Sequence, residues 1–306
     1  MKVVVLGGAG AMGGVFGGLL ARAGHEVALV DVWAEAVDAI NAVGLRLQDA
    51  SGGEDTIRVR AVTQAVDAGP ADLVVVFVKC YDTEPAVRAI APLKNDHTLV
   101  LSLQNGWGNG SRIGAIVGED RVLVGVTYHS ATVLGPGRVQ HTGRGPTLIG
   151  DLNGTASERA VNLAADLSTA GLAASATGDV IKEIWSKLAL NAAVLPVAAL
   201  LGFRAAQLIE HEGTQDLMRA LLRETVTVAN KQGIAVDYDE RWQAITSLLR
   251  RAAAAKPSML QDVERRRRTE VEVINGAVVA AGRRVDVPTP NNEAMVSLLQ
   301  SLQETF

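Results

Sequence analysis

Near its N-terminus the chain reads Val3-Val4-Val5-Leu6-Gly7-Gly8-Ala9-Gly10-Ala11-Met12-Gly13, an apolar run that passes directly into glycines. The run Lys2–Leu6 is short and β-branched, which is typical of a buried parallel strand. Residues Ala11–Ala23 have helical character, and Glu26–Val30 reads as a second strand. The order strand, glycine turn, helix, strand predicts a βαβ unit at the start of the chain.

The glycines of this turn have the spacing G-x-G-x-x-G, with Gly8, Gly10 and Gly13 at the fixed positions. Gly8 permits a tight turn, Gly10 lets the backbone approach a pyrophosphate, and Gly13 lets the helix pack on the strand. The helix N-terminus, at Ala11 and Met12, offers N–H groups and its positive dipole end to phosphates. In this context the pattern predicts a dinucleotide site; the alternative is a glycine-rich turn without a ligand.

An acidic residue, Asp31, closes the second predicted strand. An acid at this place accepts hydrogen bonds from the adenosine ribose hydroxyls and repels a 2′-phosphate. Glu35 adds negative charge, and no Lys or Arg occurs between Asp31 and Leu45. We therefore expect NAD in preference to NADP. The alternative is that Asp31 only caps the following helix.

Composition excludes several classes of protein. With 306 residues, 48% of them hydrophobic and 20% charged, the chain can bury a core and has the length of two domains. A net charge of −4 argues against a general nucleic-acid binder. One cysteine excludes a disulfide framework and a cysteine-cluster metal site, and we expect no metal. Glycines interrupt the uncharged run Val3–Ala21, and Leu188–Phe203 is short for a span, so we expect a soluble, cytoplasmic protein without a membrane segment.

The pattern of elements changes near residue 178. Before it, strands and helices alternate: Asp72–Val78 reads as a buried strand, Thr83–Leu93 as a helix, and Leu45–Arg60 and Val139–Ile149 as hairpins. Beyond it the chain reads as helices, at Val180–Leu201, Thr214–Gln232, Tyr238–Ala254, Ser258–Ala281 and Asn291–Thr305. The sequence predicts an α/β fold class, with an N-terminal Rossmann-type doubly wound sheet in residues 1–175 and an all-α C-terminal domain in residues 176–306.

The helical half carries four candidate residues for chemistry. Lys187 and Asn191 are four residues apart and share one helix face. A lysine at the edge of a buried helix suits a general acid whose pKa is lowered by burial, although such lysines are usually solvated. Ser258 begins a capping-box pattern, and a helix start with a serine hydroxyl either caps the helix or holds a carboxylate. Glu270, taken alone, looks like an ordinary surface glutamate.

Taken together, these pieces resemble the ketopantoate reductase family (2-dehydropantoate 2-reductases) through nearly the whole chain. The resemblance rests on the glycine fingerprint and on Gln104-Asn105-Gly106, Trp185-x-Lys187-Leu188-x-x-Asn191, Ser258-Met259-Leu260-Gln261-Asp262, Thr269-Glu270, Ile274-Asn275-Gly276 and Val287-Pro288-Thr289-Pro290. It implies an oxidoreductase in which a nicotinamide hydride goes to C2 of a 2-oxo acid, giving a 2-hydroxy acid.

The resemblance also implies roles for single residues. Lys187 protonates the developing alkoxide, and Glu270 holds the substrate near the reacting hydroxyl and pairs with Lys187. Asn105 lies near the nicotinamide ribose. Ser258 binds the substrate carboxylate, and Lys79 aligns with a family lysine near the cofactor.

The chain departs from the family pattern around the substrate and the cofactor. The family usually has an arginine, and NADP, where this chain has Asp31. Beyond Asn191, which aligns with an asparagine of the substrate site, ketopantoate reductases proper carry two further asparagines where this chain has Leu195 and Ala255. In the family those amides face the polar end of the substrate, so their loss disfavours a hydroxylated substrate. We therefore expect a less polar, apolar or branched 2-oxo acid, as in the NAD-dependent D-2-hydroxyacid dehydrogenases of this family.

Two other functions remain open at this point. A β-hydroxyacid dehydrogenase also pairs a Rossmann domain with helices, but its asparagine follows the lysine by three residues and it lacks the Ser-Met-Leu-Gln-Asp run. A non-catalytic NAD-binding sensor would need none of Lys187, Asn191 or Glu270. The sequence leaves the natural substrate, the direction of reaction and the oligomeric state open, a homodimer included.

Overall fold

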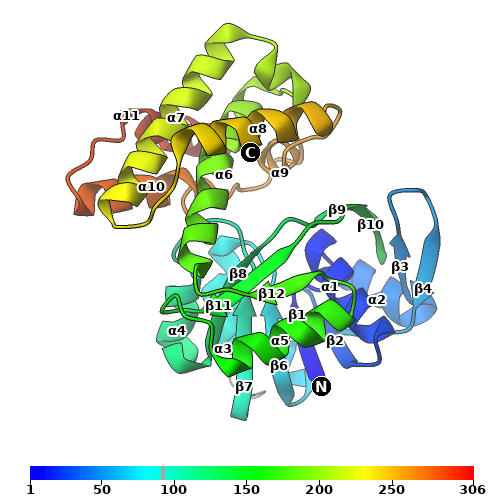
Figure 1. Ribbon diagram of the computed structural model, residues 1–306. Helices are drawn as coiled ribbons and strands as arrows, with labels where there is room; N and C mark the ends of the chain where they lie inside the picture. Colours follow the sequence, from blue (N-terminus) through cyan, green and yellow to red (C-terminus); the bar gives the residue numbers. More distant parts are fainter. Residues whose placement is uncertain (91–93) are drawn as a thin grey trace. The chain divides into compact units, whose positions relative to one another are not determined.

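The computed structural model describes residues 1–90 and 94–306, and its contacts divide it into two compact units (Figure 1). One unit consists of Met1–Gln104 and Asn109–Val180, and the other of Asn105–Gly108 and Ile181–Phe306. The first is α/β and the second helical, which confirms the predicted fold class. The inclusion of Asn105–Gly108 in the helical unit has no counterpart in the sequence pattern.

An eight-stranded sheet forms the centre of the first unit, in the order β12-β11-β8-β7-β6-β1-β2-β5. Its strands are β1 (Lys2–Leu6), β2 (Glu26–Val30), β5 (Arg60–Val62), β6 (Ala71–Val76), β7 (Lys94–Ser102), β8 (Val122–Thr127), β11 (Thr147–Asp151) and β12 (Ala174–Ala176). All neighbours are parallel except β8 and β11. The chain order reverses between β1 and β6, and ligands of such sheets bind at the carboxyl ends of the strands at this switch point.

The helices of this unit are α1 (Ala11–Arg22), α2 (Ala34–Val43), α3 (Thr83–Ala89), α4 (Asn109–Val117) and α5 (Glu158–Thr169). The predicted helix Thr83–Leu93 begins where α3 begins, but residues 91–93 lie outside the described part of the chain.

A second sheet of four strands has the order β4-β3-β10-β9. Its strands are β3 (Leu45–Gln48), β4 (Glu54–Ile57), β9 (Ser130–Gly135) and β10 (Arg138–Gly143). The hairpin predicted in Leu45–Arg60 is confirmed by the antiparallel β3–β4 pair. The hairpin predicted at Val139–Ile149 is wrong, because the turn falls earlier, where Gly137 has a φ of +63°, and β11 joins the main sheet.

Helix α1 packs against both sheets through different glycines. A Cβ atom added to Gly17 would lie 2.4 Å from Cδ2 of Leu29 in the main sheet. One added to Gly18 would lie 3.0 Å from Cδ2 of Leu45 in the small sheet. The glycines beyond the fingerprint therefore let α1 fit closely between two layers.

The second unit contains α6 (Val180–Leu201), α7 (Glu212–Lys231), α8 (Tyr238–Arg251), α9 (Ser258–Glu264), α10 (Asn275–Arg284) and α11 (Pro290–Gln303). The single helix predicted at Ser258–Ala281 is wrong. Arg266 has a φ of +52°, and the N–H groups of Arg265 and Arg267 both donate to the carbonyl of Asp262, which closes α9. Glu270 therefore lies in a turn between two helices.

Helix α6 is long and apolar enough to cross a membrane by length and composition alone, with a mean hydropathy of 1.7 over its most apolar window. However, 72% of that window is buried inside the structure, as in the core helix of a folded unit.

Two buried histidines of the first unit contact each other. His129 Nδ1 lies 2.8 Å from His141 Nε2, and His129 Nε2 lies 3.0 Å from the carbonyl oxygen of Leu172. Because the carbonyl can only accept, His129 donates from Nε2, its neutral Nδ1 accepts, and His141 donates from Nε2. Burial is the main cause that lowers the pKa of both rings, and the charge of Arg144 acts in the same direction; together with the neighbouring His129, these effects lower the pKa of His141 to about 4.

This pair predicts acid-sensitive stability. A histidine in the unfolded chain binds a proton near pH 6.5, whereas His141 in the folded protein binds one only near pH 4. The contribution of the neutral ring to the free energy of unfolding is therefore fully present above pH 6.5, and it is lost as the pH falls towards 4. Between pH 7 and pH 5, His141 alone should remove about 2 kcal/mol from the free energy of unfolding. Urea unfolding at the two pH values measures this. His141→Gln should flatten the dependence and His97→Gln, at an exposed ring, should not; equal slopes in all three proteins would contradict it.

Candidate active site

The glycine turn follows β1 and begins α1 beside the switch point of the main sheet. A Cβ added to Gly8 would lie 2.7 Å from Cβ of Leu29, and one added to Gly13 would lie 2.1 Å from the carbonyl oxygen of Gly7. Neither position can carry a side chain without moving backbone. The close packing of turn, strand and helix that the fingerprint predicts is therefore present.

The start of α1 is partly accessible. Gly10 is its N-cap residue, with an extended backbone and no side-chain cap, and Gly10, Ala11 and Met12 are half-buried. The first N–H groups of a helix have no carbonyl partner within it, and they carry the positive end of its dipole. This uncapped, glycine-lined helix start fits the pyrophosphate of a dinucleotide.

The Asp31 carboxylate joins the glycine turn to the start of α2. Its Oδ2 accepts the N–H of Ala9 at 3.0 Å, and its Oδ1 accepts the N–H of Trp33 at 3.1 Å. Trp33, and not Asp31, is the N-cap residue of α2. Asp31 is half-exposed, and a carboxylate accepts about four hydrogen bonds, so it retains acceptor capacity for ribose hydroxyls.

Gln104 fixes the ends of β6 and β7. Its Nε2 donates to the carbonyl of Val78 and to Oγ1 of Thr83, both at 2.8 Å, while Ser102 donates to its Oε1 at 3.0 Å. Lys79 follows Val78 directly and is half-buried at the carboxyl end of β6. The sequence pattern assigns Gln104 no role of its own, although it stands next to Asn105.

The segment Asn105–Gly108 is held against the turn after Glu270. The N–H of Trp107 donates to the carbonyl of Val273 at 2.8 Å. Gly106 has a φ of +88°, and a Cβ there would lie 2.4 Å from the same carbonyl oxygen. Only glycine fits such a position. These contacts hold the segment that contains Asn105 in the helical unit. Asn105 itself is half-buried.

Lys187 and Glu270 are two ionisable side chains of this unit that interact through their charges. Lys187 is half-buried on α6 and Glu270 is 7% exposed. Burial lowers the pKa of Lys187 to about 8, and the charge of Glu270 acts in the opposite direction. Such a lysine is largely protonated at neutral pH and gives up its proton far more readily than a solvated one. The pair can therefore hold and transfer a proton.

The remaining predicted residues lie along α6 and at the start of α9. Asn191 and Leu195 are buried and follow Lys187 at intervals of four residues, so they lie on one stripe of the helix. Ser258 is exposed, and the predicted capping box is wrong because Pro257 is the N-cap residue of α9 and no side-chain cap bond forms. Ala255 is exposed, and its carbonyl accepts the N–H of Ala205 at 3.1 Å.

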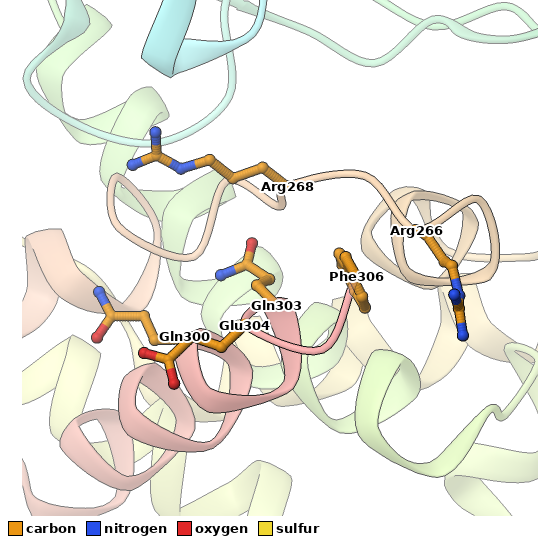
Figure 2. Close-up of a pocket in the computed structure, with 6 residues that line it drawn as sticks. All are labelled: Arg266, Arg268, Gln300, Gln303, Glu304 and Phe306. Carbon is orange, nitrogen blue, oxygen red and sulfur yellow. The ribbon is translucent and has the colours of Figure 1, made fainter.

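A hollow of about 300 Å³ lies elsewhere in the helical unit (Figure 2). It is lined by Arg266, Arg268, Gln300, Gln303, Glu304 and Phe306, none of which is a predicted site residue. Among residues 1–90 and 94–306, no three His, Cys, Asp or Glu side chains are grouped to hold a metal ion.

Comparison with known families agrees with this geometry. The family described as "Ketopantoate reductase PanE/ApbA" matches residues 4–154, and "Ketopantoate reductase PanE/ApbA C terminal" matches residues 179–303. The 2-dehydropantoate 2-reductases of Mesorhizobium japonicum and Halobacterium salinarum are each 34% identical to this chain. The alignments cover 99% of this chain and 98% and 99% of those proteins.

Solved structures give the same result. A D-mandelate dehydrogenase with NADH and anilino(oxo)acetate is 29% identical, with a TM-score of 0.93 over 100% of this chain and 99% of that one. A PanE/ApbA family ketopantoate reductase from Ralstonia eutropha JMP134 is 32% identical, with a TM-score of 0.90 over the same shares. The fold and these relatives define an oxidoreductase with a Rossmann-type unit and a helical unit. The chain belongs to the ketopantoate reductase family.

Proposed function

We propose that this protein reduces a 2-oxo acid with an apolar or aromatic side chain to the 2-hydroxy acid, with NADH as the preferred reductant. The observation that carries the proposal is the Lys187–Glu270 pair, a proton donor of lowered pKa beside a buried carboxylate. Membership of the family supports the reaction class, and the residues that differ from the family pattern support the choice of cofactor and substrate.

The chain's own residues would bind, orient and protonate the substrate. The residues of the glycine turn and Asp31 would hold the nicotinamide cofactor, which would supply the hydride for C2 of the substrate. Lys187 Nζ donates a hydrogen bond to the C2 oxygen and then its proton, and Glu270 holds the lysine and the reacting hydroxyl in place. Asn191 donates to the substrate, and Ser258 receives its carboxylate. Asn105 orients the nicotinamide ribose, and Lys79 lies beside the cofactor.

Asp31 supports the preference for NADH. Its carboxylate is fixed by the N–H groups of Ala9 and Trp33, so it cannot swing away from a 2′-phosphate without losing both bonds. NADH is also the cofactor present in the similar D-mandelate dehydrogenase structure.

Leu195 and Ala255 support a less polar substrate. Both stand where ketopantoate reductases proper carry asparagines, and neither side chain can bond a substrate hydroxyl. The similar D-mandelate dehydrogenase structure holds anilino(oxo)acetate, which has an aromatic substituent.

A panel of 2-oxo acids tests this function. Ketopantoate, branched aliphatic and aromatic 2-oxo acids are each assayed with NADH and with NADPH. We expect turnover of the apolar acids with NADH, and absence of turnover with every acid would refute the function.

The same panel yields a prediction about specificity. Each hydroxyl that loses its partner on entering the site should cost roughly 1–3 kcal/mol. Branched aliphatic or aromatic 2-oxo acids should therefore exceed ketopantoate in kcat/KM by at least about tenfold. The double variant Leu195→Asn/Ala255→Asn should shift the preference back towards ketopantoate, whereas Leu195→Met should not. Equal use of ketopantoate by the unmodified protein would contradict the prediction.

A further inference from the structure

Helix α6 contains a proline close to its predicted site residues. Pro196 has no N–H, so the carbonyl of Ala192, four residues earlier, lacks its α-helical donor. The Nδ2 of Asn275 donates to this carbonyl at 3.0 Å. A side chain from the start of α10 therefore replaces the amide proton that the proline removes.

The orientation of the Asn275 amide is fixed by a chain of hydrogen bonds that ends on a charge. Glu224 accepts Nδ2 of Asn292 at 2.7 Å, and Asn292 Oδ1 accepts Nδ2 of Asn275 at 2.9 Å. Both partners of Asn275 are thus acceptors, and its NH₂ group serves both. Asn275 is fully buried, and its Oδ1 has no hydrogen-bond partner in the described parts of the chain. An unsatisfied buried oxygen costs free energy. The amide nevertheless keeps this orientation, because both neighbouring atoms, the Ala192 carbonyl and Asn292 Oδ1, need a donor.

Asn275 also belongs to the segment that carries Glu270. The N–H groups of Val273 and Ile274 both donate to the Glu270 carbonyl at 3.2 Å, and Asn275 follows at once. The Asn275–Ala192 bond therefore joins the helix that bears Lys187 to the turn that bears Glu270. Ala192 is adjacent to Asn191, on the same helix.

We propose that Asn275 is a positioning residue, which uses the carbonyl freed by Pro196 to lock the Lys187 helix to the Glu270 turn. The proposal rests on the proposed function for its kinetic consequences. Its structural consequence, a link between α6 and the turn, is independent of any reaction.

The Asn275→Ala variant tests the link. We expect kcat for 2-oxo acid reduction to fall by about tenfold or more, since small displacements of reacting groups are costly, with the KM for NADH unchanged. Glu270 is the charged group that raises the pKa of Lys187. Its looser placement should move the basic limb of the kcat–pH profile to lower pH. Hydrogen exchange should become faster both around residue 192 of α6 and in residues 270–274.

The double variant Asn275→Ala/Pro196→Ala separates positioning from simple satisfaction of the carbonyl. An alanine at 196 restores the N–H to the Ala192 carbonyl within α6 but does not restore the link to the turn. We expect the amide hydrogens of α6 to exchange slowly again, as in the unmodified protein. The kcat, its pH profile and the hydrogen exchange of residues 270–274 should stay as altered as in Asn275→Ala. Recovery of all of them would overturn the proposal, because Asn275 would then serve only the helix.

Two controls complete the design. Asn292→Ala removes the acceptor that helps to orient the Asn275 amide but leaves the Asn275–Ala192 bond possible, so it should lower kcat by less than Asn275→Ala does. Pro196→Ala alone should keep kcat within about twofold. If Asn275→Ala does not fold, Asn275→Ser takes its place in the same set. Absence of turnover in the unmodified protein would refute the proposed function. The hydrogen-exchange data alone would then test whether Asn275 connects α6 to the Glu270 turn. Normal exchange at 270–274 in the Asn275 variant would overturn this connection.

Discussion

Replacing Lys187 by alanine should lower kcat for 2-oxo acid reduction by about 10²–10⁴-fold, the usual contribution of a general acid. NADH binding should be almost unchanged, because the glycine turn and Asp31 belong to the other unit. Steady-state kinetics and NADH fluorescence titration measure the two effects. Lys182→Ala, at an exposed lysine on the same helix, is the matched control. Near-normal turnover of the Lys187 variant would show that another group is the acid.

The pH dependence of the unmodified enzyme provides a second test of Lys187. The proton donor must be protonated, and burial lowers its pKa to about 8. The rate of reduction should therefore be level below pH 8 and fall as the pH rises through it. Oxidation of the 2-hydroxy acid requires the neutral amine, so its rate should rise over the same range. The limb near pH 8 should be missing from the residual activity of Lys187→Ala.

Replacing Asp31 by arginine should change the ratio of kcat/KM for NADH over NADPH by about 100-fold in favour of NADPH. A fixed carboxylate beside a 2′-phosphate costs several kcal/mol of repulsion, and every 1.4 kcal/mol is tenfold. Kinetics with both cofactors at saturating 2-oxo acid measure the ratio. The efficiency with NADH should also fall, because the carboxylate that holds the N–H groups of Ala9 and Trp33 is gone.

Two variants separate charge from hydrogen bonding at this position. Asp31→Asn keeps one acceptor but removes the charge, so it should narrow the preference without inverting it. Glu35→Gln removes an exposed charge nearby in sequence and should change the ratio much less. Equal efficiency of the unmodified enzyme with NADPH would refute the assignment of Asp31.

The parts of the fold that sequence predicted are those with local signals. The runs of valine and leucine predict that β1 and β6 are buried on both faces. The glycine turn is predicted by three glycines within one short segment. The small sheet on α1 was not predicted, because it joins residues 45–57 to residues 130–143. No local pattern records a pairing between segments so far apart.

The candidate site shows the same limit. Lys187 and Asn191 could be placed on one face from their spacing alone. The turn that carries Glu270 was hidden in an apparently continuous helix, because its break depends on the left-handed backbone of Arg266. The role of Asn275 depends on a proline 79 positions earlier in the chain (275 − 196) and becomes visible only when the two helices are packed.

The placement of Asn105–Gly108 in the helical unit has a practical consequence for dissecting this enzyme. The chain passes between the two units at three places, after Gln104, Gly108 and Val180. A single cut after Val180 would therefore leave Trp107 on one fragment and the Val273 carbonyl that it binds on the other. A chimera that takes its C-terminal half from a relative should therefore also take that relative's counterpart of Asn105–Gly108. Otherwise Gly106 would pack against a different backbone at the position of Val273.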